Sequence, residues 1–210
     1  MRTNSGFSLS RPVERCLPQA LTSEADGQVY PIDADFHTVL ACLRHLADPD
    51  RDELQKRLFL GDRFFLGQPP YDGVDLFSAF VTGGEAGVTD EPPLMDFEQD
   101  ADALYASFRQ QYGIDLLRTP LHWFEFRALV TGLTGQTPLG ERVRLRALNE
   151  SRLAPEDRAL ARRLKAQIAV RPRVGKAEQA LLAELDSRLA AGENPDDVLA
   201  RLKQLPDTAG

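Results

Sequence analysis

The chain has 210 residues, of which 42% are hydrophobic and 27% are charged. These values are typical of a folded globular protein and exclude a chain that is disordered throughout. Its two cysteines are too few for a disulfide framework, and no stretch approaches the roughly 18–20 apolar residues of a membrane span. We therefore expect an intracellular protein that binds no membrane.

The charge is spread unevenly along the chain. Its net value of −7 argues against general nucleic-acid binding. Residues 139–173 contain ten basic and four acidic side chains, whereas residues 84–102 contain seven acidic side chains and no basic one. Two arrangements fit this asymmetry: the acidic and basic segments face each other within one fold, or they meet between neighbouring copies of the chain.

The patterns predict an all-α protein in three segments. Residues 1–27 carry little pattern and are expected to be mobile. Residues 28–173 are expected to form a multi-helix globular domain, and residues 174–210 a C-terminal helical hairpin. The alternating sequence GQVYPI, residues 27–32, is expected to form a short extended segment at a sheet edge, because Pro31 cannot donate a backbone hydrogen bond.

Three helices are predicted ahead of the acidic segment, at residues 33–46, 49–59 and 74–81. Asp33 is the expected cap of the first helix. Leu54 and Leu58 are expected to point inward from the second helix, since they lie one turn apart on one face. The glycine- and proline-rich residues 82–93 are expected to form a loop.

The segment 96–113 combines an acidic start with an apolar helical stripe. Asp96, followed three residues later by Gln99, is a capping-box pattern, and Gly113 stands where a left-handed C-cap belongs. The stripe has apolar side chains at positions i, i+4, i+7, i+8, i+11 and i+15, which predicts one helix. It consists of Phe97, Ala101, Leu104, Tyr105, Phe108 and Tyr112.

Four carboxylates lie within seven residues at the start of this helix: Asp96, Glu98, Asp100 and Asp102. The helix dipole stabilises acids in the first turn, by about 0.3–1 kcal/mol each, but does not extend to Asp100 and Asp102. These two acids therefore require a positive partner. We predict a structural ion pair with Arg127 of the next helix, whose partner is Asp100, Asp102 or Asp115. A partner contact and a metal site are the alternatives, although the glycine turn of a calcium loop is missing.

The next predicted helix, at residues 121–133, is apolar on nearly every side and is expected at the centre of the fold. Thr119 and Pro120 are its expected cap and first residue. Two basic helices are expected at the surface, at residues 137–148 and 155–170, because their apolar stripes are narrow. The C-terminal hairpin then comprises a helix at residues 176–190 and a short final helix capped by residues 194–197.

No catalytic residue, cofactor site or metal site is predicted. The chain has no P-loop, no HExxH and no GxSxG motif. Two groupings contain histidine, but neither has a nucleophile or a third orienting group: His37 with Asp33 and Asp35, and His122 with Glu125. The alternative from the enzyme class is a metal-dependent hydrolase that uses Asp96, Asp100 and His122.

The charged helices offer a candidate surface for self-association or for a partner. Aromatic side chains are not interleaved with the arginines, which argues against stacking of single-stranded nucleic acid. The residues of this candidate surface are Glu98, Arg142, Arg144, Arg146, Arg162 and Arg163.

The sequence DFEQDADALYASFRQQYGIDLL, followed by LHWFEFRALVTGL, resembles the core signature of the bacteriophage Gp15 family, found in tailed phages and prophages of Gram-positive bacteria. YPIDADFHTVL, residues 30–40, also resembles the family's N-terminal segment. The resemblance covers about residues 30–172, so the C-terminal hairpin is an addition. The matching signature positions are Asp96, Phe97, Asp100, Asp102, Tyr105, Phe108, Tyr112, Gly113, Ile114, Asp115, Leu121, His122, Trp123, Phe126 and Arg127.

The resemblance implies a role in tail morphogenesis and no established catalytic residues. Genes of this family stand beside tail-tube and tape-measure genes, which favours a tail assembly chaperone that coats the tape-measure protein. A structural component retained in the virion tail is the alternative. The expected partners are the tape-measure or other tail proteins and further copies of the chain, and the expected location is the cytoplasm of the bacterial host or the virion tail.

Overall fold

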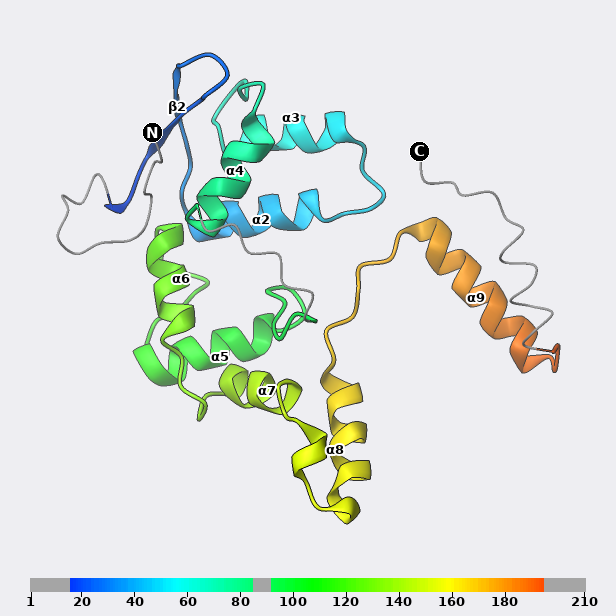
Figure 1. Cartoon of the computed structure of the whole chain (residues 1–210). Coiled ribbons are helices and arrows are strands. Elements are labelled where there is room, and N and C mark those ends of the chain that lie inside the picture. Colours follow the sequence, from blue (N-terminus) through cyan, green and yellow to red (C-terminus); the bar gives the residue numbers. More distant parts are fainter. Residues whose placement is uncertain (1–15, 85–91, 195–210) are drawn as a thin grey trace. The chain divides into compact units, whose positions relative to one another are not determined.

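A computed structural model of the chain describes residues 16–84 and 92–194 (Figure 1). Backbone contacts divide the chain into two compact units. Of the described residues, unit 1 contains 16–47, 51–84 and 92–171, and unit 2 contains 48–50 and 172–194. The predicted final helix lies outside the described residues, as does the predicted mobile segment up to residue 15.

Helices make up most of the regular structure in the described ranges, which confirms the predicted all-α class. None of the described helices is long and apolar enough to cross a membrane. Unit 1 contains α2 (Phe36–Leu46), α3 (Glu53–Arg63), α4 (Gly73–Thr82), α5 (Ala101–Tyr112), α6 (Trp123–Thr131), α7 (Pro138–Arg146), a 3-10 helix η1 (Glu150–Arg152) and α8 (Pro155–Ile168). Unit 2 contains α9 (Lys176–Ala190), the first helix of the predicted C-terminal hairpin.

A two-stranded antiparallel sheet precedes the helices. Strand β1 (Ala20–Thr22) pairs with β2 (Val29–Pro31), and Leu21 lies opposite Tyr30. The extended segment predicted at residues 27–32 therefore has a partner strand, which comes from the segment expected to be mobile. The hydroxyl of Ser23 ties this hairpin to the helical part by donating to Asp72 at 2.7 Å.

An aromatic core holds unit 1 together, and α6 supplies its centre, as the sequence predicts. Trp123, Phe124 and Phe126 are all buried. The ring of Phe126 lies 4.4 Å from that of Phe36 on α2 and 5.6 Å from that of Phe108 on α5, measured between ring centroids. Because aromatic side chains bury large apolar areas, these contacts fix how the three helices meet.

The N-termini of α2 and α6 are joined through their backbones. The N–H of Phe36 donates to the carbonyl of Leu121 at 3.0 Å, and the N–H of Trp123 donates to the carbonyl of Ala34 at 2.8 Å. The cap of α2 is Asp35, whose carboxylate accepts from the N–H of His37 at 2.9 Å. The prediction that Asp33 caps α2 is therefore wrong.

Helix α3 exposes two leucines that were expected to be buried. Its cap is Asp52, which starts the helix four residues later than predicted. Leu60 and the C-cap residue Phe64 point into the core. The side of the helix facing away from them carries Leu54 and Leu58, which are 66% and 60% exposed.

Candidate functional site

The acidic segment begins with a turn that Asp96 caps. The Asp96 carboxylate accepts from the backbone N–H groups of Glu98 and Gln99, both at 2.9 Å, as the predicted capping pattern requires. Helix α5 itself begins later than predicted, at Ala101. Its C-cap is the expected Gly113, whose φ of 70° is left-handed and favours glycine.

Gln99 does not complete the predicted capping box. Its side-chain amide instead forms two hydrogen bonds to the backbone of Arg171, which lies 72 positions away in the sequence. The amide donates to the Arg171 carbonyl at 2.7 Å and accepts from the Arg171 N–H at 2.9 Å. The side-chain amide thus bonds to both backbone groups of one residue, as a neighbouring β-strand would, and it holds the segment that follows α8 in place.

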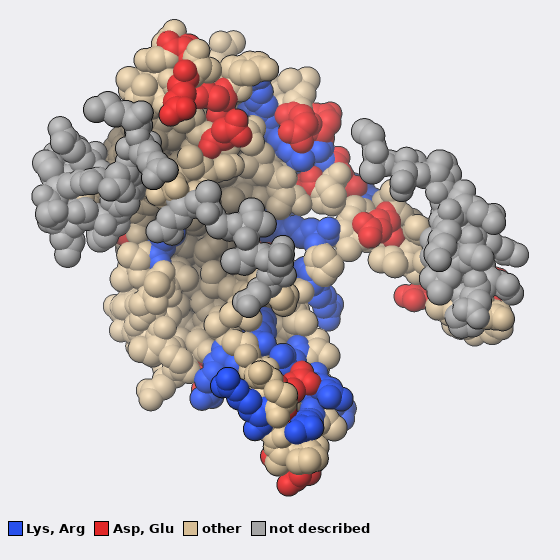
Figure 2. All heavy atoms as spheres, viewed as in Figure 1, with Lys and Arg blue, Asp and Glu red and all other residues tan. Residues whose placement is uncertain are grey.

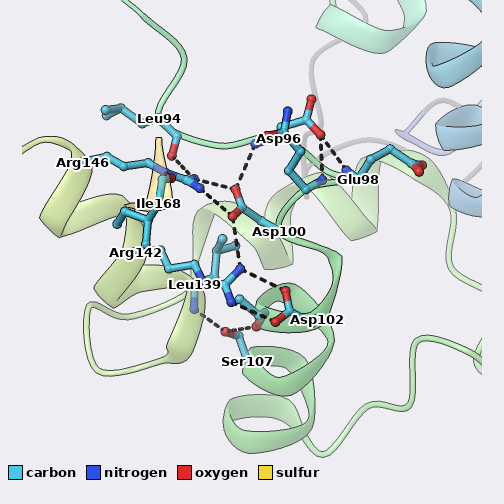
Figure 3. Close-up of polar contacts among 12 residues, drawn as sticks. Leu94, Asp96, Glu98, Asp100, Asp102, Ser107, Leu139, Arg142, Arg146 and Ile168 are labelled. Carbon is cyan, nitrogen blue, oxygen red and sulfur yellow. Dashed lines mark hydrogen bonds and ion pairs between the residues drawn. The ribbon is translucent and has the colours of Figure 1, made fainter. Parts of the chain in front are cut away.

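Asp100 and Arg146 form a buried ion pair (Figure 3). The two Arg146 terminal nitrogens donate to the two Asp100 oxygens at 2.6 and 2.8 Å, a bidentate geometry. The Asp100 side chain is 1% exposed and the Arg146 side chain 8% exposed. Burial by itself raises the pKa of Asp100. Hydrogen bonds from Arg146, the Asp96 backbone and Arg142, together with the charge of Arg146, outweigh burial, so the pKa lies below its usual range.

Arg142 adds a second, more exposed bidentate pair. Its guanidinium donates to the two oxygens of Asp102 at 2.9 and 2.8 Å and also approaches Asp100 at 3.3 Å. The Asp102 side chain is 73% exposed. Hydrogen bonds from Arg142 lower the pKa of Asp102. We call Asp100, Asp102, Arg142 and Arg146 the acid–arginine junction.

Arg146 also connects the junction to two other segments. Its Nε donates to the carbonyl of Ile168 at the end of α8, at 2.6 Å, and Nη1 donates to the carbonyl of Leu94, at 2.8 Å. The guanidinium therefore joins α5, α7, the end of α8 and the segment before α5. Four of its five N–H groups are therefore used in contacts that hold the fold together.

The prediction that Arg127 pairs with Asp100, Asp102 or Asp115 is wrong. The acids of α5 pair with Arg142 and Arg146, and Asp115 pairs with Arg118 three positions away, at 2.6 Å. Arg127 points elsewhere: its Nη1 lies 3.0 Å from the position that a β-carbon on Gly83 would take, at the C-cap of α4. Helix carbonyl ends carry partial negative charge, which gives the cation a favourable environment there.

A signal for the true partners is present in the sequence. Leu139, Arg142, Val143 and Arg146 stand at positions i, i+3, i+4 and i+7, which lie on one helical face. Leu139 is buried and Val143 packs against the core, so the two arginines on this face point inward with them. The Arg146 side chain, 8% exposed, is therefore buried and does not belong to the predicted partner surface, whereas the Arg142 side chain is 32% exposed.

The other predicted surface residues lie on the outside of unit 1. Arg144 and Arg163 are exposed, and Arg162 is exposed while pairing with Glu150 at 2.8 Å. Glu98 approaches Arg44 of α2 at 3.6 Å. Figure 2 shows basic side chains gathered over the part of unit 1 that contains α7 and α8.

His122 and Glu125 serve as caps of α6. Nδ1 of His122 accepts from the N–H of Phe124 at 3.1 Å, and the Glu125 carboxylate accepts from the His122 N–H at 3.2 Å. The other ring nitrogen, Nε2, lies 3.1 Å from the carbonyl of Pro18 and therefore carries the proton. Burial lowers the pKa of His122, although the Pro18 carbonyl opposes the shift. The cap predicted at Thr119 is replaced by His122.

The residues of the hydrolase alternative are each engaged in these structural contacts. Asp96 caps a turn, Asp100 is held by two arginines, and His122 caps α6. Within residues 16–84 and 92–194, no group of three or more His, Cys, Asp or Glu side chains is placed to hold a metal ion.

One family model matches part of the chain. The model of the family described as bacteriophage Gp15 protein matches residues 79–170, which span α5 to α8 and hence the whole acid–arginine junction. Comparisons with curated proteins and with solved structures gave no significant match. Residues 79–170, somewhat less than half of the chain, are thus similar to the bacteriophage Gp15 protein family.

Proposed function

We propose that this phage morphogenesis protein is a non-enzymatic tail assembly chaperone that binds the tape-measure protein. The family match supports a structural or morphogenetic role. A tape-measure protein is long and helical, so a protein that keeps it soluble needs an apolar surface shaped for helices. The observation that carries the proposal is a helix that exposes leucines and in which none of the described residues is buried.

That helix is α9, in which no residue is buried. Leu182, Leu185 and Leu189 stand at positions i, i+3 and i+7 and form one apolar stripe. Leu182 and Leu189 are 47% and 43% exposed. An isolated helix of this length gains little stability from propensity alone, so a stripe of this kind is stabilised by packing against a partner.

The chemistry of the described residues also favours binding over catalysis. Burial raises the pKa of Cys42 to about 12, so its thiol stays protonated and is a poor nucleophile at neutral pH. His122, Asp96 and Asp100 each hold backbone or arginine partners that define the fold.

Coexpression with the tape-measure protein of the same phage tests the proposal. The full chain should keep the tape-measure protein in the soluble fraction and copurify with it. The double variant L182S/L189S should lose both effects, because it removes two exposed leucines without touching a buried residue. Leu117→Ser is the matched control, since Leu117 is 74% exposed and lies outside α9.

Two outcomes would overturn the proposal. The first is a tape-measure protein that is equally soluble with and without the chain. The second is recovery of the chain in stoichiometric amounts from purified phage particles, which would make it a retained structural component of the tail, because a chaperone leaves before the tail is complete.

A further inference from the structure

Helix α9 ends in a turn, and the sequence beyond that turn carries a second apolar stripe. Residues 195–210 follow the turn and lie outside the described residues. We propose that the segment 195–205 covers the leucine stripe of α9 as the second helix of a hairpin, and that a helix of the tape-measure protein has to displace it. The inference rests on the proposed function only for the identity of this competitor.

The stripe on α9 is broad and belongs to a helix with a defined start. Four leucines fall within about 100° of the helix circumference, none of them buried: Leu181, Leu182, Leu185 and Leu189. The N–H of Lys176 donates to the carboxylate of Asp50 at 3.0 Å, and a carboxylate at this end also stabilises the helix dipole. The leucines are therefore accessible on a formed helix.

A Schellman motif ends α9. The N–H of Glu193 donates to the carbonyl of Arg188 at 3.1 Å, and the N–H of Gly192 donates to the carbonyl of Leu189 at 3.0 Å. Gly192 has a left-handed φ of 86°, as this motif requires. The helix therefore stops at a fixed place, and the chain leaves it through a defined turn.

The sequence after the turn has the pattern of a second helix. Asn194 and Pro195, a capping residue followed by proline, are typical of a helix start. The connection, residues 191–194, is about as short as the loops of two to five residues that join antiparallel helices. Four apolar side chains then stand at positions i, i+1, i+4 and i+7, which lie on one helical face: Val198, Leu199, Leu202 and Leu205.

The two stripes are in register about the turn. In an antiparallel hairpin, residues at equal distances in sequence from the turn lie level, because both helices rise by about 1.5 Å per residue. With the turn centred between residues 193 and 194, three pairs come level: Val198 with Leu189, Leu202 with Leu185, and Leu205 with Leu182. Each of these apolar residues of the segment thus has a leucine of α9 opposite it.

The short connection favours a segment of the same chain as the occupant of the stripe. A short linker holds a segment near its site at an effective concentration of about millimolar, which a separate protein does not reach at ordinary expression levels. The covered stripe binds the tape-measure protein only in the fraction of molecules that are open. The hairpin therefore lowers the apparent affinity of α9 for that protein and keeps the leucines from unspecific contacts until it is made.

Oxidation of paired cysteines in the full-length chain tests the register. In L185C/L202C the two thiols stand at level positions, so mild oxidation should form a disulfide within one molecule. L185C/K203C is the matched control, because position 203 is rotated by about 100° from position 202 and should oxidise far more slowly. Non-reducing gels separate monomers from linked dimers, and peptide mass spectrometry identifies the bond. The native Cys16 and Cys42 are both buried.

Hydrogen exchange of the α9 amides tests the cover without added cysteines. V198S/L202S removes two apolar side chains of the segment, and A200S/Q204S alters two positions with the same spacing on its polar side. The α9 amides of V198S/L202S should exchange faster by about tenfold or more, because loss of a buried apolar contact shifts local opening by at least that factor. A200S/Q204S should exchange as the unaltered chain does.

Coexpression with the tape-measure protein tests the competition. V198S/L202S leaves the α9 stripe open, so it should copurify with more tape-measure protein than the unaltered chain does. A200S/Q204S should capture the same amount as the unaltered chain. Equal capture by V198S/L202S and A200S/Q204S would show that the segment does not compete, and this part of the inference would then be wrong.

The measurements on the chain alone decide whether the segment covers α9. Oxidation of L185C/L202C no faster than its control, or equal exchange in V198S/L202S and A200S/Q204S, would overturn the inference. A disulfide that links two molecules would also overturn it and assign the stripe to a second copy. A tape-measure protein that copurifies with none of the chains, while the disulfide and the protection are present, would overturn only the proposed function.

Discussion

Asp100 and Asp102 show how burial changes the role of a carboxylate. The two residues stand two positions apart and both pair with arginine. Asp102 is exposed, so water competes with Arg142 for its charge. Asp100 is enclosed with Arg146, and each of these two ions depends on the other because neither is solvated.

Replacement of Asp100 by Asn should therefore destabilise the protein strongly. The Arg146 guanidinium would stay buried without its countercharge, and the free energy of unfolding should fall by about 3–5 kcal/mol. Asp102→Asn is the matched control and should cost less than about 1 kcal/mol, as for an exposed pair. Urea unfolding followed by circular dichroism measures both. Equal losses for the two variants would contradict the structural role assigned to the buried pair.

His122 links the stability of unit 1 to pH. Its pKa in the folded chain lies below the unfolded value of 6.5, chiefly because the ring is buried. The unfolded chain therefore binds the proton more tightly, and the contribution of His122 is complete above pH 6.5 and decreases as the pH falls below it.

The variant His122→Asn should weaken this pH dependence. Asparagine keeps a capping oxygen for α6 but does not titrate, so the loss of stability between pH 7.5 and pH 5 should be smaller than in the unaltered chain. Free energies of unfolding from urea titrations across that interval give the comparison. An unchanged slope in His122→Asn would assign the pH dependence to other groups.

At the scale of elements, the close approach of α7 to the loop before it sets the position of the junction. Thr137 caps α7, and its hydroxyl accepts from the N–H of Gly140 at 3.2 Å. The N–H of Leu139, also in the first turn of α7, donates to the Ser107 hydroxyl of α5 at 2.9 Å. The first turn of α7 is thus held by side chains from two sides, and Arg142 follows one turn later.

Gly140 cannot accommodate a side chain in this arrangement. A β-carbon there would lie 2.1 Å from the Thr134 carbonyl oxygen and 2.8 Å from the Gly135 α-carbon, both backbone atoms. Gly140→Ala should therefore displace α7 and cost about 1–3 kcal/mol of stability. Gly135→Ala is a control five residues away, because nothing lies within 4 Å of its β-carbon position. Thermal unfolding of the Gly140→Ala and Gly135→Ala variants gives the test. Similar melting temperatures would contradict the prediction, because they would show that the loop before α7 can move to make room for the methyl group.

At the scale of the whole molecule, the sequence predicts what depends on local periodicity. The stripe of α5, its C-cap at Gly113 and the central place of α6 all follow from spacings within one helix. The cap of α6 lies three residues later than predicted, because His122, with an extended backbone and a ring nitrogen as acceptor, takes the place of the expected Thr119.

Features that depend on how two helices meet were not predicted correctly. Arg127 was assigned to the acids of α5 from its place on a mostly apolar helix, but the rotation of α6 directs it to the end of α4. Leu54 and Leu58 lie one turn apart on one face of α3, a spacing typical of a buried face. The structure instead buries Leu60 and Phe64 on the other side of the helix. A helical spacing defines a face and leaves open which neighbour that face meets.

The contact between His122 and the Pro18 carbonyl spans 104 residues of chain. A ribosome adding about 5–20 residues per second needs about 5–20 s to make that interval. During this time α2 and the β-hairpin have been made, but the ring of Phe126, against which Phe36 stacks, has not. The nascent chain therefore keeps its first apolar surfaces open until the middle of the family-matched segment emerges, and only then can the core close around α6.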